Sequence, residues 1–283
     1  MGLTLYNKII NLTFTKNNLT VCKITCPSTG RKPNIKISGT LTGGDTLTQL
    51  EIRIKNFYSS SLISQGMSVM VNAGYETSLA LAVKGEITSI YTANPAPESE
   101  TVITCTVAAL EDYITTPVDI LVLNPTVSSV VNAINAPLKF SAPYIDSSLK
   151  AKKIDIPFYA KGTVKDAVSQ FKRYFGNIAN ISISRNRITV TPPDKGTSQV
   201  FTLTALKSPP CLCGTTVSVT ALWDPEIRPQ DYIKVNSDFY KSDISSATRS
   251  LKKYKYLVST VAFSFSTITD DNTMTIVATS SEE

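Results

Sequence analysis

Five cysteines are the side chains of this sequence with the clearest metal-binding chemistry: Cys22, Cys26, Cys105, Cys211 and Cys213. Cys22-x-x-x-Cys26 and Cys211-x-Cys213 together hold four thiols, which is the number of ligands in a structural zinc site. Neither spacing is the usual C-x-x-C, however, and an odd cysteine count agrees better with small buried residues on strands. We therefore expect packing roles for all five and no metal site.

Histidine is absent from the chain. This removes Ser-His-Asp and Cys-His catalysis, and with them the side chain most used for proton transfer near neutral pH. Two carboxylates could still hydrolyse a glycan, and the candidate pairs are Glu111 with Asp112 and Asp270 with Asp271. Both pairs lie beside turn or strand-end signals, where solvated acids are common. We expect no catalytic residue and no cofactor, so the protein is predicted not to be an enzyme.

The densest basic cluster comprises Arg249, Lys252, Lys253 and Lys255, with tyrosines interleaved, in a chain of net charge +6. Basic groups beside aromatic rings suit the phosphates and bases of nucleic acids. Edge strands, however, also use lysine to block unwanted pairing. Because no wider basic block accompanies the cluster, we expect a solvated loop and strand edge.

The composition is that of a folded β-rich protein. The 283 residues are 42% apolar, and they are rich in the β-branched residues that favour strands. No apolar run approaches the roughly 18 residues that span a bilayer. The segment from Met1 to Tyr6 lacks the basic and apolar blocks of a signal peptide. We expect a soluble protein that is made in the cytosol.

A short stretch occurs twice in the chain, at residues 63–73 and 227–237. The two copies align without gaps, and Asn72 then falls on Asn236. In each copy a polar turn carrying Gly or Pro leads into a strand whose apolar residues alternate. Neither copy contains a catalytic group. We interpret the repeat as the sign of two related β-modules in one polypeptide.

Residues 1–113 are predicted to form the first β-barrel module. Residues 50–55 alternate strictly between apolar and charged side chains, which is the pattern of a half-buried antiparallel strand. Bends are expected at Gly39, at residues 43–45 and at residues 74–76, because each carries turn-forming residues. Several short strands joined by such turns indicate a small barrel or sandwich.

Residues 114–199 change character and are predicted to form a small α+β domain. Asn124 and Pro125 suit a helix start with proline at the first helical position, and apolar residues then recur at i, i+3, i+4 and i+7. A second helix is expected after Thr163, whose hydroxyl can cap it. Asp166, three residues further on, completes a variant of the capping box.

Alternating segments follow the second helix to the end of the chain. Residues 181–184 and 188–190 alternate around Arg185 and Asn186 and are expected to form a tight hairpin. Residues 200–283 are predicted to form the second β-barrel module, with a terminal strand pair at residues 256–265 and 273–278. This pair follows the second copy of the repeated stretch, as a similar pair follows the first.

Five segments of the chain, in their order along the sequence, resemble the baseplate hub proteins of contractile-tailed bacteriophages and related contractile injection systems. The resemblance covers most of the chain, and the order of the segments, rather than any single motif, carries it. The segments concerned are residues 50–57, 63–75, 85–87, 162–168 and 222–237.

The resemblance implies a mainly β fold with a small α+β insertion, in which two related antiparallel β-barrel tube modules flank a helix-plus-hairpin domain. It further implies a structural virion protein of the tail baseplate, assembled in the host bacterial cytoplasm. Three copies would form a pseudo-sixfold ring that joins the hexameric tail tube to the trimeric central spike.

The resemblance also implies the partners of such a ring. They are two further copies of the chain, the tail tube protein, the central spike protein, and baseplate wedge or other tail proteins. DNA would pass through the channel without sequence-specific binding, and no membrane insertion is expected.

Other classes of function stay open on the residues alone. One is a different tail component, such as a distal-tail adaptor, in a contractile or another type of tail. Another is a carbohydrate- or receptor-binding β-protein, in which the single tryptophan, Trp223, would stack on a sugar. A third is the glycan hydrolase. We expect Trp223 to fill the core between two strands instead.

Overall fold

The computed structural model describes residues 7–281, except for 18, 28–31, 43–48, 58–59, 77, 94–98, 108–114, 139, 185–186, 194, 198, 243–253 and 271. Most of the described chain is β-strand, which confirms the predicted mainly β class. No helix among these residues is long and apolar enough to cross a membrane.

The amino-terminal part of the chain is a β-module whose strands follow one another in the order β2-β1-β5-β6-β7-β4-β3. All of its neighbouring strands are antiparallel. The elements are β1 (Lys8–Lys16), β2 (Leu19–Ile24), β3 (Ile35–Thr42), β4 (Gln49–Lys55), the short 3-10 helix η1 (Ser60–Leu62), β5 (Ser68–Tyr75), β6 (Ser78–Ala93) and β7 (Glu100–Val107).

The carboxy-terminal part is a second β-module, in which β18 lies between β19 and β16. Its strands are β13 (Val200–Leu203), β14 (Cys211–Cys213), β15 (Thr216–Leu222), β16 (Tyr232–Val235), β17 (Lys241–Ser242), β18 (Lys255–Ser266) and β19 (Asn272–Ser281). The terminal pair β18–β19 was predicted and is confirmed. The pairings β13–β16 and β14–β17 are parallel, which alternation of side chains does not predict.

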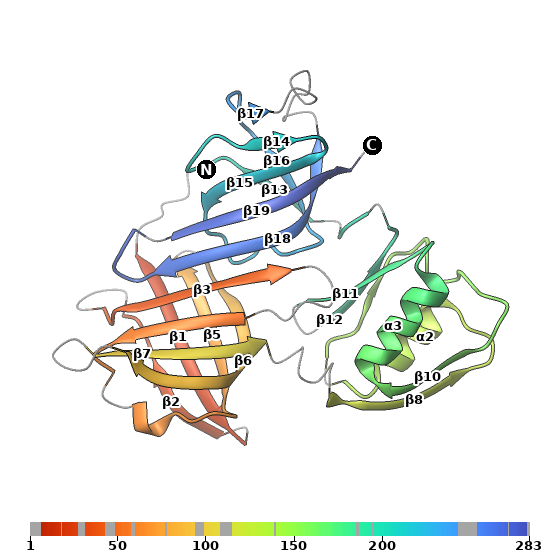
Figure 1. Cartoon of the computed structure of the whole chain (residues 1–283), viewed down its shortest axis with the longest axis horizontal. Coiled ribbons are helices and arrows are strands. Elements are labelled where there is room, and N and C mark those ends of the chain that lie inside the picture. The colour runs from red at the N-terminus through yellow and green to blue at the C-terminus, as the bar shows by residue number, and fades with distance from the viewer. Residues whose placement is uncertain are drawn as a thin grey trace.

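The two β-modules share one hydrophobic core and one sheet. Strand β3 of the first module pairs with β18 of the second, so the sheet runs without a break through both (Figure 1). Inward-facing isoleucines such as Ile37 and Ile52 are fully buried, as the alternating pattern of β3 and β4 predicts.

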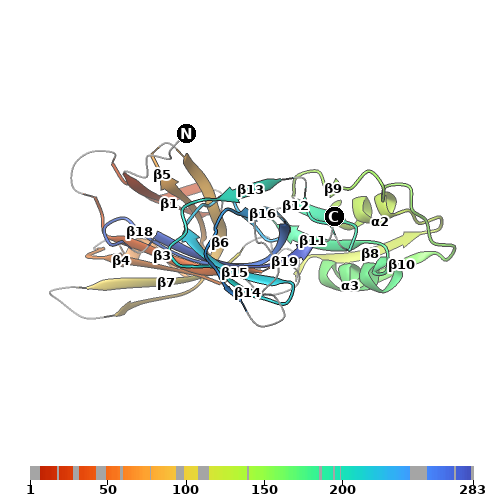
Figure 2. The ribbon, with the colours of Figure 1, turned by 90° about the horizontal axis from the view of Figure 1, so that it is seen from above.

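The middle of the chain forms a separate unit beside the two modules, with a hydrophobic core of its own (Figures 1 and 2). Strand β8 pairs with β10, while β11, β12 and β9 form a three-stranded sheet. The elements are β8 (Pro117–Val122), α2 (Val127–Asn135), β9 (Tyr144–Ile145), β10 (Phe158–Thr163), α3 (Val164–Phe175), β11 (Asn180–Ser184) and β12 (Arg187–Thr191).

Helix α3 begins as its sequence predicts. The Thr163 side chain accepts a hydrogen bond from the Asp166 backbone N–H, and the Asp166 carboxylate accepts one from the Thr163 N–H at 2.8 Å. Gly162 precedes the cap with φ +129°, and a Cβ there would lie 2.5 Å from an Asp166 carboxylate oxygen. A glycine is therefore needed where the capping carboxylate folds back over the chain.

Acid is expected to weaken the structure partly through Asp166. The hydrogen bonds from the Thr163 N–H and hydroxyl hold the pKa of Asp166 below its ordinary value. A depressed folded-state pKa stabilises the fold above the unfolded-state pKa of about 3.9, and this stability is lost as the pH falls through the folded-state value. We expect Asp166→Asn to be less stable than the wild type at pH 7 and to lose less stability on acidification.

Thermal unfolding followed by circular dichroism between pH 2 and pH 7 tests this expectation. Asp155→Asn, an exposed carboxylate of the same unit, is the control. Parallel pH profiles for the wild type and Asp166→Asn would contradict the assigned role of the carboxylate.

Three expected boundaries are wrong. Helix α2 is capped by Thr126, whose hydroxyl accepts from the Ser129 N–H, so Pro125 precedes the cap instead of opening the helix. Gly39 lies inside β3, and Gly74 lies inside β5. Close packing explains Gly39, where a Cβ would lie 2.8 Å from the Gln49 carbonyl oxygen, whereas Gly74 has φ +149°, a backbone conformation that favours glycine.

Candidate functional site: the seam between the two β-modules

The contact between β3 and β18, called the seam below, joins residues that lie more than 200 positions apart. Seven antiparallel residue pairs form it, from Lys36↔Ser266 to Thr42↔Thr260. Thr267 continues the contact beyond the last pair. Its hydroxyl donates to the Pro33 carbonyl at 2.6 Å and accepts from the Ile35 N–H at 3.0 Å.

Gly39 lies at the centre of the seam, opposite Phe263 on β18 and Leu50 on β4. A Cβ at Gly39 would lie 2.8 Å from the Gln49 carbonyl oxygen and 3.3 Å from the Phe263 ring. The first distance is below van der Waals contact with a backbone atom that the neighbouring strand fixes. The glycine therefore allows the Phe263 ring to lie close to β3.

Aromatic rings fill the core behind the seam. Trp223 follows β15 and is only 2% exposed, which confirms its predicted place in the core. Its ring stacks on Phe263 with centroids 5.2 Å apart and meets Phe265 at 4.6 Å. Tyr75, from the end of β5 in the first module, also meets Phe265, in a T-shaped contact with centroids 5.6 Å apart. The rings thus connect both modules.

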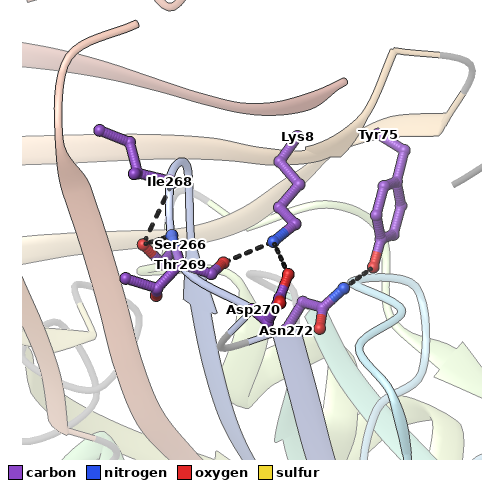
Figure 3. A network of polar contacts seen from close by, with 7 residues as sticks. All are labelled: Lys8, Tyr75, Ser266, Ile268, Thr269, Asp270 and Asn272. Atoms are coloured by element: carbon purple, nitrogen blue, oxygen red, sulfur yellow. Dashed lines mark hydrogen bonds and ion pairs between the residues drawn. The ribbon is translucent and has the colours of Figure 1, made fainter. Parts of the chain in front are cut away.

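Polar contacts connect the same two modules at the end of the seam (Figure 3). Lys8 of β1 donates to the Thr269 carbonyl, and its ammonium lies 3.7 Å from the Asp270 carboxylate. The Asn272 side-chain amide donates to the Tyr75 hydroxyl at 3.2 Å, and both side chains are buried. Burial also raises the pKa of Tyr75, so its phenol stays neutral well above pH 7.

Tyr75→Phe is expected to lower the free energy of unfolding by about 1 kcal/mol. The variant keeps the ring contact with Phe265 but removes the hydroxyl that accepts from Asn272, and a buried hydrogen bond of this kind is worth about that much. Urea unfolding followed by circular dichroism measures the change. Tyr159→Phe, on an exposed tyrosine of β10, is the control and should change little.

The internal repeat predicted from the sequence is present in the order of strand pairing. The first module follows the order β5-β6-β7-β4-β3, and the second follows β16-β18-β19-β15-β14. The two copies of the repeated stretch lead into β5 and β16, the first strand of each series. The seam therefore joins the last strand of one series to the second strand of the other.

An irregularity recurs at the same place in the two series. The pairing of β6 with β7 shifts at Thr88, and the pairing of β18 with β19 shifts at Ser259. Thr88 donates its hydroxyl to the Thr104 carbonyl at 3.1 Å, and Ser259 donates to the Val277 carbonyl at 2.8 Å. These matched bulges align the two modules residue by residue.

The cysteines occupy two kinds of environment. Cys26 and Cys105 are buried as predicted, and Cys22 on β2 is half-buried. Burial raises the pKa of Cys22 and brings that of Cys105 to about 12, which leaves little of the thiolate that binds metals.

Cys211 and Cys213 are exposed, so the expected burial is wrong for this pair. They alternate with the buried Leu212 on the short strand β14, and alternation directs both thiols outward. Among the residues that the structure describes, no three His, Cys, Asp or Glu side chains are grouped to hold a metal ion.

The structure describes only one of the four carboxylates in the two candidate catalytic pairs. Glu111, Asp112 and Asp271 lie outside the described residues. Asp270 is exposed and faces Lys8 in the network of Figure 3. The one described carboxylate of these pairs therefore has a structural contact.

The basic cluster is described only at its end. Arg249, Lys252 and Lys253 lie outside the described residues. Lys255 begins β18, and Tyr256 is a buried core residue of that strand. Tyr256 is therefore not presented to a nucleic acid.

Exposed apolar side chains gather in two places that the predicted site residues do not include. On the outer face of the β8–β10 pair, Leu121 lies opposite Tyr159, with Leu123 just beyond. In the second module Phe239 is 81% exposed and borders a shallow recess. The other residues of the recess are Leu206, Lys207, Ser208, Pro209 and Ser237. The signal for the first group was the run of apolar residues 120–123, because a strand directs alternate members of such a run to opposite faces.

Comparisons with known proteins agree with this architecture. The family model described as "Baseplate hub gp41" matches residues 45–270 of the chain. No curated protein sequence matches the chain.

Several solved structures share the fold at low sequence identity. A tail protein from Neisseria meningitidis MC58 aligns with a TM-score of 0.60 at 10% identity, over 97% of each chain. The E. coli c3393 protein, described as a type VI secretion component similar to the T4 tail proteins gp27 and gp5, aligns with a TM-score of 0.59 at 11% identity. That alignment covers 90% of this chain and 76% of that one.

A chain of the Francisella PdpA–VgrG complex also aligns, with a TM-score of 0.52 at 9% identity. The alignment covers 98% of this chain and 58% of that one. At such low sequence identities, these alignments show a shared fold only.

Proposed function

The chain belongs to the baseplate hub gp41 family, and on this basis we propose that three copies form a ring that joins a hexameric tail tube to a trimeric central spike. Membership makes it a structural component of a phage tail baseplate, and hence of the virion. In the proposal, residues 1–113 and 200–283 are the two tube modules, and residues 114–199 are the domain between them.

The repeated order of strand pairing is the observation that supports this proposal. Two modules of the same topology lie side by side in one sheet, joined at the seam. Three such chains supply six similar modules, so a threefold ring presents an approximately sixfold surface. Internal duplication combined with closed symmetry can in this way match a hexamer on one face and a trimer on the other.

The surfaces rather than a reactive site carry the proposed function. We propose the tail tube protein, the central spike protein and baseplate wedge or other tail proteins as partners, with assembly in the host cytoplasm. DNA passes along the central channel without sequence-specific contacts, and the protein catalyses no reaction. The likeness of the fold to a chain of the PdpA–VgrG complex supports a role within a multiprotein assembly.

Imaging of the assembled tail tests the proposal. Electron cryomicroscopy of tails that contain the chain should show three copies in a ring, with a tube ring on one side and a spike on the other. The mass of the ring released from the particles should be three times that of one chain, which is 30.7 kDa. A baseplate with one or six copies per tail would overturn the proposal.

A further inference from the structure

Strand β6 has an edge that the described chain leaves without a partner strand. Its first part pairs with β5 as far as Glu86, and its last part, from Gly85 to Ala93, pairs with β7. Beyond Ile87, the edge that faces away from β7 has no neighbouring strand in the described residues. Tyr91, in this part of β6, is 51% exposed, and tyrosine is enriched at protein interfaces.

The corresponding edge of the second module is occupied. The matched bulges place Thr88 on Ser259, so residues 89–93 of β6 correspond to residues 260–264 of β18. In β18 those residues pair with β3, and this pairing is the seam. This edge is therefore covered by a strand in the second module and, among the described residues, uncovered in the first.

The register identifies the strand that corresponds to β3. Ser38 of β3 pairs with Glu51, which pairs with Thr104. Cys211 of β14 pairs with Ser218, which pairs with Val277.

Thr104 and Val277 are the carbonyl acceptors of the two bulge hydroxyls and therefore correspond. It follows that Cys211 corresponds to Ser38 and that β14 corresponds to β3.

We propose that β14 of one copy pairs antiparallel with the unpartnered edge of β6 in the next copy, so that the seam within one chain is repeated between chains. This inference rests on the proposed ring and specifies how its copies meet. Ser38 lies opposite Ser264 in the seam, and Ser264 corresponds to Ala93. In the junction between copies, Cys211 thus lies opposite Ala93, and Cys213 lies opposite Tyr91.

Strand β17 holds the outer edge of β14 within a single copy. Among the described residues, Lys241 and Ser242 are the two that β17 pairs with β14, and both are exposed. A short edge strand that carries lysine is a common protection against unwanted strand pairing. In the proposed junction the next copy takes the place of β17, so β17 must leave β14 when the ring closes.

Disulfide cross-linking tests the register with a natural thiol. Directly opposed residues of antiparallel strands have Cα atoms about 4.5–5.5 Å apart, which lies within the range of a disulfide. Ala93→Cys is therefore expected to form a covalent link to Cys211 of the next copy when assembled rings are mildly oxidised. Non-reducing electrophoresis should show dimers and trimers that disappear on reduction.

Three control variants define the result. Ala93→Cys combined with Cys211→Ser should lose the link. Leu62→Cys places a thiol on the exposed side chain of η1, which is not one of the strands in the proposed junction, and should give no link to Cys211. Lys241→Cys combined with Ala93→Cys and Cys211→Ser tests whether β17 remains between the copies, and it should also give none.

The possible outcomes distinguish a failure of the proposed strand junction from a failure of the proposed ring. Three copies per ring without an Ala93→Cys link to Cys211 would overturn the proposed register and leave the ring intact. A link from position 93 to position 241 would show that β17 stays in place, which also overturns it. If wild-type particles contain no threefold ring, the proposed function fails, and the junction fails with it.

Discussion

Replacing Trp223 by alanine is expected to lower the free energy of unfolding by about 3–5 kcal/mol, the usual cost of removing a large buried aromatic side chain. Trp223 is 2% exposed and contacts the rings of Phe263 and Phe265, so alanine would leave a cavity directly behind the seam. Urea unfolding followed by circular dichroism gives the change. We also expect a shallower dependence on urea if the two β-modules begin to unfold separately.

Trp223→Phe is the matched control because it keeps an aromatic ring in the same space and should cost less than the alanine variant. The single tryptophan also makes wild-type fluorescence a direct reporter of the seam. Fluorescence and circular dichroism should therefore show coincident transitions in the wild type. A loss below about 1 kcal/mol in Trp223→Ala would contradict the central packing role assigned to the ring.

Gly39→Val is expected to cost about 3 kcal/mol, at the upper end of the usual effect of overpacking. The first added carbon would already lie 2.8 Å from the Gln49 carbonyl oxygen, and the branched side chain would also press against the Phe263 ring. Relief requires β3 to move away from β4 or from β18. We therefore expect the loss of stability to be accompanied by faster proteolysis between the modules.

Ser38→Val is the control because it places the same side chain on the neighbouring residue of β3, whose side chain points to the other face of the sheet. Equilibrium unfolding and limited proteolysis of the two variants provide the comparison. Equal stability of Gly39→Val and the wild type would show that β3 can shift without disturbing the seam.

The local elements of the chain could be predicted because each depends on a few neighbouring residues. Residues 50–55 alternate and form β4, and Thr163 with Asp166 caps α3. The hairpin of β11 and β12 was expected from two short alternating segments, and it is present with its turn outside the described residues. Each of these elements follows either from the alternation of apolar residues along a strand or from a capping residue at the start of a helix.

The seam itself could not be predicted, because it depends on pairing between residues far apart in the chain. Gly39 carries the same local signal whether it forms a turn or allows close packing, and only the position of Phe263 decides between them. The start of α2 shows a similar competition on a smaller scale. Pro125 and Thr126 can each open a helix, and the bond from the Ser129 N–H to the Thr126 hydroxyl selects the second.

The sequence predicted the two modules that the candidate site joins, but not the residues at which they meet. The repeated stretch indicated two related modules, and the pairing order confirms that they share a topology. The sequence did not show that Tyr75 and Asn272 meet, or that Cys211 lies outward on a short edge strand. Both depend on which strands become neighbours, and strand order is not encoded in alternation alone.

The seam also determines how the chain can fold during synthesis. Strand β3 ends at Thr42, and the first residue of β18 that pairs with it is Thr260, 218 positions later. At about 5–20 residues per second, ribosomes need roughly 10–45 seconds to make that interval. During this time the edge of β3 that β18 later covers is unpaired, while the rest of the first module can already form.

An unpaired strand edge is a template for aggregation. The two-module design therefore depends on completion of the chain, and chains that stop before β18 present this edge to other strands. Nascent or truncated chains that accumulate in the host cell can therefore aggregate through this edge. Strand β18 removes that hazard when it pairs with β3.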